Sequence, residues 1–382
     1  MDYSALLMVI PVLVIIACVL YAARSIIDGK NIVGSVIALS ISIILLAVVI
    51  VPAIQGFNTS PGIDGDYQYD DYIEAPDAIS ANGAMELTTI NSTKYLHCIG
   101  LGNATVTYSD DHTENYSVGK AKLDVFLLMG QSNAAYFIYD PATATPSPAM
   151  GTAYYYGDEN GPIFYGQPSA PSYDTSFQSY SMRDMESNAG NAIGHLEIPF
   201  SAKYTEATGN KVYIINASMV GTSIQYFAPD QYTYNYCKKV FDHALDSVNP
   251  TYYSISVKSL IWIQGERDYN MSIDQYKSYF VDITESMINK EFNKDYSIKN
   301  FMISKTRVID PTGTPSGVNA INSAEAQKEL ATEYSYIHLA TDIADTFTVA
   351  NGLMESDNLH YSQLGQNQIG TAIADYYLAN IE

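Results

Sequence analysis

A serine that follows an apolar run is the first feature of this chain that could perform chemistry. Residues 127–133 read LLMGQSN, so an apolar segment stops at Gly130 and Ser132 follows in a polar turn. Such a run is typical of a buried strand, and α/β proteins keep their site residues at the ends of strands. By itself the stretch fits an ordinary strand and loop equally well. A nucleophilic Ser132 also requires a base, an acid that orients the base, and donors for an oxyanion.

The base and the acid are predicted near the end of the chain. Asp357 lies three residues before His360, a spacing that places both side chains on one side of a turn. Asp357 can then accept the ring N–H of His360, which leaves the other ring nitrogen facing Ser132. The other five histidines lie in a β-rich segment (His97, His112) or in segments without an acid at a useful spacing (His195, His243, His338).

Two glycine turns, each after an apolar run, are further candidates. Gly221 lies in the stretch MVGTSI at 219–224, which follows the run 212–216. Gln264, Gly265 and Glu266 follow the run 260–263. Each stretch is also compatible with a plain turn or a polar loop, so its function depends on whether the fold brings it to Ser132.

Strand-like and helical runs alternate from Lys122 onward, and these elements must position the candidate residues. The expected strands are Val125–Met129, Val212–Asn216, Leu260–Ile263, Phe301–Ser304 and Ile337–Ala340. Apolar residues recur at helical spacing at Ile273, Tyr276, Phe280, Ile283 and Met287, and again at Leu364, Ile369, Ile373, Tyr377 and Leu378. This alternation predicts an α/β domain over residues 122–382, with a parallel sheet and helices on both faces.

Residues 139–191 break the alternation, because they are rich in Pro, Gly, Ser and Tyr. The segment is too long for a plain connection in a compact domain. We expect a functional insertion that shapes the substrate pocket.

Two uncharged apolar runs occupy residues 3–23 and 32–54. At 1.5 Å per residue each is about 30 Å long, the thickness of a bilayer core. They predict a transmembrane helical hairpin over residues 1–56, with spans at about 4–23 and 32–54. Arg24 and Lys30 lie between the spans, so the positive-inside rule places this link in the cytoplasm and everything after Gln55 outside. A cleaved signal peptide fits poorly, since residues 1–3 are acidic where a basic segment is needed.

Two segments connect the predicted hairpin to the α/β domain. Residues 57–81 are rich in Gly, Pro, Asp and Tyr and are expected to form a linker or stalk. Residues 82–121 are expected to form a β-rich lead-in, because 105–118 alternate like a hairpin with a polar turn at 109–112.

The composition restricts the partners. The formal net charge is -22 with only 19 Lys and Arg, so nucleic acid and anionic lipid headgroups would be repelled. The three cysteines, Cys18, Cys98 and Cys237, show no metal-like spacing, although Cys98 and Cys237 could pair in an oxidising compartment. Asn-x-Ser/Thr sequons, compatible with an exterior location, begin at Asn58, Asn91, Asn103, Asn115, Asn216 and Asn270.

Taken together, the motifs resemble the SGNH-hydrolase superfamily. From about Leu123 to Ile381 the chain is similar to the sialate O-acetylesterase-like and acetylxylan-esterase-like carbohydrate esterases. The resemblance rests on matches in the family's order, namely Gly130-Gln131-Ser132-Asn133, Gly221-Thr222-Ser223-Ile224, Trp262-Ile263-Gln264-Gly265-Glu266-Arg267-Asp268, Ala324-Glu325-Ala326-Gln327, Asp357-Asn358-Leu359-His360-Tyr361 and Leu364-Gly365. Ile263 stands where the family usually has His, Arg267 where it has Ser, and Val220 where a second Gly is common. These departures alter the pocket wall and leave the substrate preference open.

The resemblance implies an SGNH-like three-layer α/β/α fold and a serine esterase that removes O-acetyl groups from sialic acid or another acetylated glycan. Ser132 is then the nucleophile, and His360 and Asp357 complete a catalytic triad. No metal or organic cofactor is expected.

The resemblance also implies how the triad is assisted. The N–H groups of Ser132 and Gly221, with the amide of Gln264, are expected to hold the oxyanion. Gln131, Asn133 and Glu266 are expected to support the site. Glu266 has two interpretations: it steadies the Gln264 loop through a hydrogen bond, or it is a second acid near His360.

Two other functions remain as alternatives. The first is a catalytically silent surface protein that keeps the fold for glycan binding, and the complete set of Ser132, Asp357 and His360 argues against it. The second is a lipase or thioesterase of the same superfamily. The Gln264-Gly265-Glu266 block and the lack of an apolar lid segment near Ser132 favour a sugar substrate instead.

Overall fold

The computed structural model describes residues 65–135, 143, 145–158, 161–162, 180–185, 195–307 and 320–382. The chain divides into two units, residues 1–62 and 63–382. The two predicted spans and residues 57–64 of the predicted linker lie outside the described residues. In the part of the chain that is described, no helix is both long enough and apolar enough to cross a membrane.

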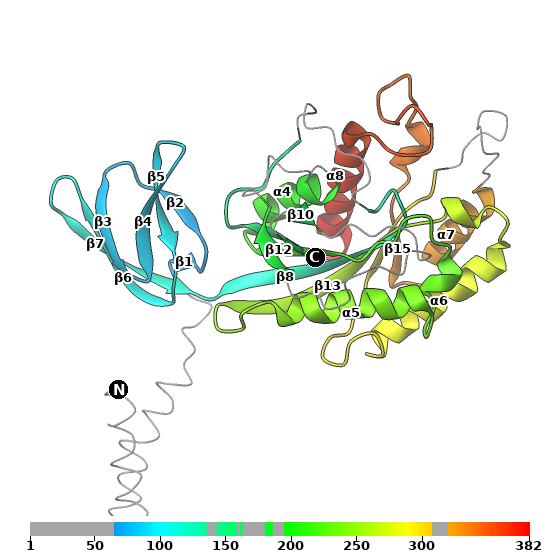
Figure 1. The fold of residues 1–382 in the computed structure, drawn as a ribbon, viewed down its shortest axis with the longest axis horizontal. Helices are drawn as coiled ribbons and strands as arrows, with labels where there is room; N and C mark the ends of the chain where they lie inside the picture. Colours follow the sequence, from blue (N-terminus) through cyan, green and yellow to red (C-terminus); the bar gives the residue numbers. More distant parts are fainter. Residues whose placement is uncertain are drawn as a thin grey trace, which may run out of the picture. The chain divides into compact units, whose positions relative to one another are not determined.

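An eight-stranded sheet forms the centre of the larger domain, in the order β10-β9-β12-β8-β13-β14-β15 with β11 paired to β9 (Figure 1). The strands are β8 (Ala121–Gly130), β9 (Ala153–Asp158), β10 (Gly161–Pro162), β11 (Ser181–Asp184), β12 (Lys211–Asn216), β13 (Tyr253–Ile263), β14 (Phe301–Ser304) and β15 (Ile337–Thr341). The path from β9 to β15 is parallel, whereas β10 and β11 pair antiparallel with β9. All five strands expected from the sequence are confirmed, each within β8 or β12–β15.

Helices cover both faces of this sheet (Figure 1). They are α4 (Glu197–Thr208), α5 (Tyr232–Asp246), α6 (Ile273–Ile288), α7 (Ile321–Glu333) and α8 (Gln363–Asn380), with short 3₁₀ turns η3 (Ile224–Phe227), η4 (Glu266–Asp268) and η5 (Ile343–Thr346). On β8, Val125 and Leu127 join the core that contains α5 and α6, while Phe126 and Leu128 join the core that contains α4 and α8. A strand buried on both faces is mostly apolar, which is why the segment Val125–Met129 of β8 reads as a continuous apolar run. The domain is therefore a three-layer α/β/α structure.

A smaller β-domain, residues 65–119, precedes the sheet. It consists of two sheets, β1-β7-β6-β3 and β2-β5-β4. Its strands are β1 (Tyr67–Gln68), β2 (Tyr72–Glu74), β3 (Ala78–Gly83), β4 (Met85–Ile90), β5 (Thr93–Cys98), β6 (Gly102–Tyr108) and β7 (Thr113–Gly119). Leu96, Cys98, Val106 and Val118 form its core. The predicted hairpin at 105–118 is confirmed as β6 and β7, which pair antiparallel.

The structure corrects two predicted boundaries. The linker expected at 57–81 already contains β1, β2 and the start of β3. The insertion expected at 139–191 contains β9, which is a strand of the main sheet, and also β10 and β11. β1, β2 and β9 lie in Gly- and Pro-rich surroundings, and they pair with β7, β5 and β12, respectively, which are not adjacent to them in the sequence. Their local composition is therefore typical of a linker or loop, although their partners make them strands.

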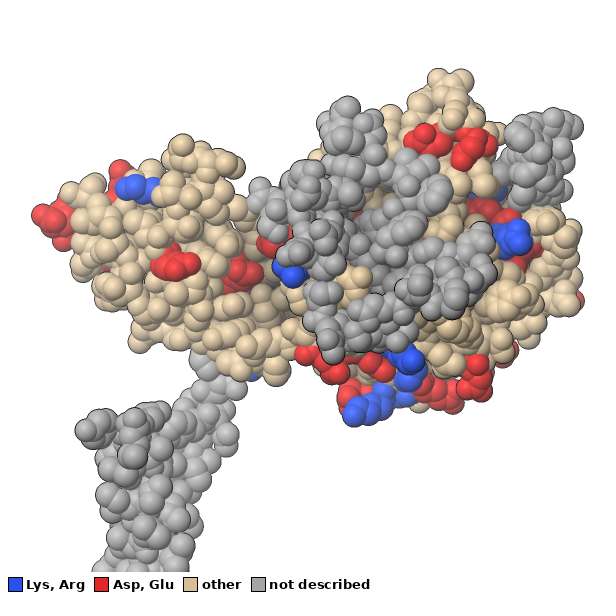
Figure 2. Space-filling model, viewed as in Figure 1, with Lys and Arg blue, Asp and Glu red and all other residues tan. Residues whose placement is uncertain are grey.

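Two other sequence features are resolved by burial. Cys98 and Cys237 are both free and buried, so they do not form the disulfide considered above. The sequon residue Asn216 is 6% exposed and its side chain is hydrogen-bonded inside the protein, so it is inaccessible to glycosylation. Acidic side chains are spread over the β-domain and the larger domain on the face shown in Figure 2, in keeping with the net charge of -22.

Candidate active site

Ser132, His360 and Asp357 meet at the end of β8, as the sequence predicted. The Nε2 atom of His360 lies 3.0 Å from the Ser132 hydroxyl, and Nδ1 lies 2.6 Å from Asp357 Oδ2. Ser132 lies in the turn after β8, and the other two lie in the turn that leads into α8. A serine, an imidazole and a carboxylate in this arrangement can transfer the serine proton to the imidazole.

The turn that carries the acid and the base is built by Asp357 itself. Its Oδ1 accepts the N–H groups of Leu359 and His360, at 2.9 and 3.0 Å. Partial burial would raise the pKa of Asp357, but these hydrogen bonds and the one to the His360 ring outweigh it and hold the pKa below its ordinary value. Arg307, which the sequence analysis missed, donates to the carbonyl and side-chain oxygens of Asn358. Asp357 is thus fixed in position and kept ionised.

The Ser132 turn is held against β13 by a close backbone approach. The N–H of Gln131 donates to the carbonyl of Ile263 at 3.1 Å. A Cβ atom at Gly130 would lie 2.0 Å from the Ile263 oxygen, which only glycine avoids. On the other side of the turn, the Asn216 amide donates to the carbonyl of Ala134 at 2.8 Å.

Gln131 and Asn133 flank the serine and connect it to the other loops. The Gln131 side-chain oxygen accepts the N–H of Arg267 at 3.2 Å. The Asn133 amide donates to Glu266 Oε1 at 2.7 Å and to the Leu359 carbonyl at 3.2 Å, and its oxygen accepts the Tyr361 N–H at 3.0 Å. Asn133 therefore connects the Ser132 turn with the Glu266 loop and with the acid–histidine turn.

Of the two interpretations of Glu266, the geometry favours a supporting residue. Its Oε1 accepts from Asn133, and its Oε2 has no hydrogen-bond partner among the described residues. Asp357, and not Glu266, makes the carboxylate contact to the His360 ring. Glu266 is 5% exposed, and burial raises its pKa against the opposing effects of the Asn133 hydrogen bond and the nearby His360.

Gln264 does not occupy the position expected of an oxyanion donor. Its amide nitrogen donates to the Thr222 carbonyl at 3.2 Å and to the Asp268 carboxylate, and the whole side chain is buried. The main-chain carbonyl of Gln264 accepts hydrogen bonds from the Tyr276 hydroxyl at 2.9 Å and from the Gln327 side-chain amide at 2.7 Å. Because both hydrogens of the side-chain amide are used, Gln264 links the loops and is not the expected oxyanion donor. Asp268, which was not among the predicted site residues, also accepts the Ile224 N–H at 3.0 Å.

The two predicted backbone donors remain. The N–H of Met219 donates to the Gly130 carbonyl at 2.8 Å, which continues the β12–β8 pairing and brings the Gly221 turn beside the Ser132 turn. Gly221 has a φ of 66°, a left-handed conformation that favours glycine. Among the described residues, neither the Ser132 N–H nor the Gly221 N–H donates a hydrogen bond, so both are open to an oxyanion.

The prediction that only His360 has a nearby acid was wrong. His195 Nδ1 lies 2.6 Å from Glu197, and Glu197 in turn accepts the Asn216 amide at 2.7 Å. Both side chains are buried, so this pair supports Asn216 and the Ser132 turn from behind. His97 and Asp70 pair at 2.7 Å in the β-domain. Glu197 lies two residues after His195 and Asp70 lies 27 residues before His97, so neither acid has the three-residue spacing of Asp357 and His360. In the described residues, no three His, Cys, Asp or Glu side chains are grouped to hold a metal ion.

The environment of Glu266 predicts a pH-dependent stability. Because burial raises its pKa above the unfolded value, the ionised carboxyl destabilises the folded state once the pH exceeds that unfolded value. We expect Glu266→Gln to have a higher Tm than the wild type at pH 8, and the gain to vanish below pH ~4, where both states bind the proton. Thermal unfolding of both proteins between about pH 4 and pH 8 measures this difference in Tm, with a change at the exposed Glu206, Glu206→Gln, as the control. A Tm difference that does not change with pH would show that the pKa of Glu266 is not raised in the folded state.

Comparison with known proteins gives the family. Residues 172–379 match the model of the family described as carbohydrate esterase, sialic acid-specific acetylesterase. The matched range contains Asp357 and His360 but begins after Ser132, so the place of the serine rests on the geometry above. A search of curated proteins returned no match.

Similar solved structures include a protein from Arabidopsis thaliana, with 14% identity over 68% of this chain and 99% of that one and a TM-score of 0.47. A carbohydrate acetylesterase from Xanthomonas citri has 14% identity over 83% and 73%, with a TM-score of 0.42. An aryl esterase from M. smegmatis has 12% identity over 67% and 99%, with a TM-score of 0.33. At these TM-scores the likenesses support no further statement. The family match spans more than half of the chain, and the chain therefore belongs to the carbohydrate esterases of the sialic acid-specific acetylesterase family.

Proposed function

We propose that this protein is a membrane-anchored serine esterase that works outside the cytoplasm and removes O-acetyl groups from an acidic glycan such as sialic acid. The observation that carries the proposal is the hydrogen-bonded series from Ser132 through His360 to Asp357. The family contributes the class of reaction, hydrolysis of a carbohydrate ester.

The proposed mechanism has two halves. His360 Nε2 takes the proton of Ser132 as its oxygen attacks the acetyl carbonyl, and Asp357 stabilises the resulting imidazolium. The tetrahedral intermediate collapses when His360 returns the proton to the sugar oxygen, which leaves and keeps its own carbon–oxygen bond to the ring. Water then gives a proton to His360 as its oxygen attacks the acetyl-enzyme. The second tetrahedral intermediate collapses when His360 returns this proton to the Ser132 oxygen, so the ester bond to Ser132 breaks, acetic acid leaves and ionises to acetate, and the free serine and neutral imidazole are restored.

The oxyanion of both intermediates is proposed to lie between the N–H groups of Ser132 and Gly221. Both donors are backbone groups in turns that other contacts fix, so they need not reorganise during the reaction. Loss of one such donor typically costs about 2.7–4 kcal/mol of barrier.

Substitution of the triad tests the proposal. We expect Ser132→Ala to lower kcat for acetyl-ester hydrolysis about a thousandfold or more, and Asp357→Asn to lower it far more than Glu266→Gln, because only Asp357 contacts the His360 ring. A fluorophosphonate probe should label the wild type but not Ser132→Ala. Absence of labelling in the wild type would favour the silent glycan-binding protein, and a larger loss in Glu266→Gln would reverse the roles of the two acids.

Arg267 supports an acidic sugar as the substrate. Its backbone N–H is held by Gln131, next to the nucleophile, while its exposed guanidinium makes no hydrogen bond or ion pair with another described residue. It borders a cavity of about 380 Å³, which is also lined by the exposed rings of Tyr226 and Tyr269. Its charge acts on the buried carboxylate of Asp268, which lines the same cavity, but its exposed guanidinium still offers a substrate carboxylate a local partner with bidentate geometry.

The role of Arg267 is tested by comparing two substrates. We expect Arg267→Ala to lower kcat/KM for an O-acetylated sialic acid by about 10–100-fold, the range for a lost hydrogen bond to a charged group. The same change should leave p-nitrophenyl acetate hydrolysis nearly unchanged, and Arg267→Lys should restore part of the loss. Equal losses on both substrates would show that Arg267 supports the site without selecting the sugar.

The membrane anchor is proposed from the sequence of residues 1–56, whose two apolar runs flank Arg24 and Lys30. We expect the full chain to sediment with membranes and to resist extraction with alkaline carbonate, whereas a chain that begins at residue 57 should be released. A protease added outside intact cells should cleave the region after residue 57. Protection of that region from the protease would reverse the proposed orientation.

A further inference from the structure

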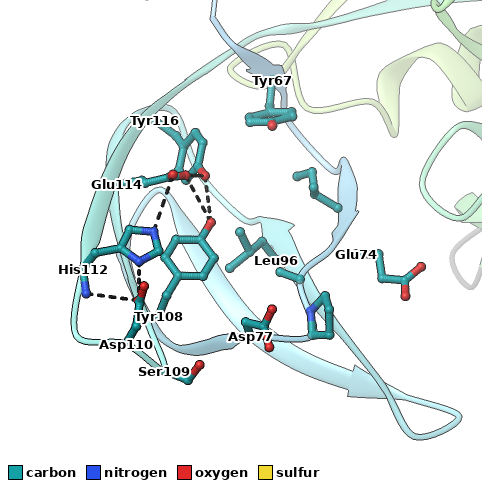
Figure 3. A pocket seen from close by; sticks show the side chains of 13 residues that line it. Tyr67, Glu74, Asp77, Leu96, Tyr108, Ser109, Asp110, His112, Glu114 and Tyr116 are labelled. Atoms are coloured by element: carbon teal, nitrogen blue, oxygen red, sulfur yellow. Dashed lines mark hydrogen bonds and ion pairs between the residues drawn. The ribbon is translucent and has the colours of Figure 1, made fainter.

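The β-domain contains a cavity of about 590 Å³ between its two sheets, apart from the residues of the esterase site (Figure 3). This volume is in the range of small-molecule sites. Its walls come from β1, β2, β5, β6, β7 and two loops, and the lining residues used below are Tyr67, Glu74, Asp77, Leu96, Tyr108, Asp110, His112, Glu114 and Tyr116. Nothing in the proposed esterase mechanism uses this cavity.

Two exposed carboxylates at the cavity are not neutralised by another described residue. Glu74 and Asp77 make no side-chain hydrogen bond or ion pair with another described residue. Figure 3 shows Glu74 across the cavity from His112, with Leu96 between them, whereas Asp77 lies near Ser109, whose N–H donates to the Asp77 backbone carbonyl at 2.9 Å. No Lys or Arg belongs to the lining, so these two carboxylates present acceptors only.

The opposite side is occupied by a connected set of rings and acids. Glu114 accepts the hydroxyl groups of Tyr108 and Tyr116, which also lie 2.7 Å from each other. His112 contacts the carboxylates of Asp110 and Glu114, and the Asp110 hydrogen bond raises the pKa of His112. The imidazole thus offsets charge on this side, whereas Glu74 and Asp77 stay uncompensated.

Aromatic and apolar side chains form the rest of the cavity wall. Tyr67 meets Tyr116 edge-on with ring centres 5.6 Å apart, and Tyr108 is stacked on His112 at 4.5 Å. Leu96 supplies an apolar, buried surface between the two sides. Tyrosine faces attract cations through the ring quadrupole, and carboxylates hold them through charge-assisted hydrogen bonds.

From this combination we infer that the β-domain has a second binding site, which takes an organic cation, an ammonium group carried on a carbon skeleton. Uncompensated carboxylates repel an anion such as a sialic acid carboxylate, so this ligand differs from the proposed esterase substrate. A bare inorganic cation would leave the aromatic and apolar walls unused. The ammonium group has two possible sources, an amino sugar or the side chain of lysine in a peptide.

Binding of matched ligands to the full chain in detergent tests the inference. We expect a glucosamine tetramer to bind at least 10-fold more tightly than the N-acetylglucosamine tetramer, which has the same skeleton without the charge. A tetralysine peptide separates the two sources: tighter binding of the sugar identifies an amino sugar, and tighter binding of the peptide identifies a lysine side chain. Equal affinity for the two sugar tetramers, or binding of none of the three ligands, would overturn the proposal.

Variants locate the binding. The double change Glu74→Gln and Asp77→Asn should weaken binding of the preferred cation at least 10-fold, while the control pair Glu206→Gln and Asp246→Asn, two exposed acids of the larger domain, should not. Tyr67→Leu should weaken binding if the rings take part. Esterase activity should persist in every variant, because none of the changed residues belongs to the proposed esterase site, and a circular dichroism spectrum like that of the wild type should show that the β-domain of each variant is folded. Equal binding by the double variant and its control would place the cation elsewhere and overturn the site.

Discussion

Gly130 of β8 lies opposite Ile263 of β13, and Leu128 lies opposite Asn216 of β12. Three neighbouring strands therefore end together, and because they are parallel the loops that follow them leave from the same edge of the sheet. The Ser132 turn, the Gly221 turn and the Glu266 loop therefore meet at this edge. The register is set by burial, since a slip of one residue in β8 would exchange the side chains that face the two cores.

Where the loops meet, buried amides hold them in place. Four amide side chains are nearly inaccessible to solvent, and each makes a hydrogen bond to a loop from another part of the chain. They are Gln131, Asn133 and Gln264 of the loops themselves and Gln327 of α7. A buried amide without partners would be costly, so each of these side chains stabilises one arrangement of the loops over the alternatives. The positions of Ser132 and His360 thus depend on buried residues of the neighbouring loops.

Two carboxyl groups close to Ser132 and His360, those of Asp357 and Glu266, differ mainly in their surroundings. Asp357 is half exposed, accepts two backbone N–H groups and contacts the His360 ring, so its charge is stabilised. Glu266 is buried with one unpartnered oxygen, so its charge is disfavoured. The first environment suits an acid that must stay ionised beside an imidazolium, and the second suits a residue that holds a loop.

The sequence by itself determined the elements whose signal is local. Apolar runs identified β8 and β12–β15, because the central parts of strands covered on both faces are mostly apolar. The three-residue spacing of Asp357 and His360 identified the acid–histidine turn, because a carboxylate can reach back to the N–H groups of its own turn. The glycine-ended motifs placed Ser132 and Gly221 at strand ends, and the resemblance named the supporting residues Gln131 and Asn133.

Only the tertiary structure decided the contacts between segments distant in the chain. The short strands β1, β2 and β9 exist through their partners, so the composition around them was misleading. Gln264 changed from an expected oxyanion donor to a buried link between loops, since Thr222 and Asp268 take its amide hydrogens. Hydrogen-bond partners of this kind are set by which chain segments pack together, and no spacing within one segment encodes that.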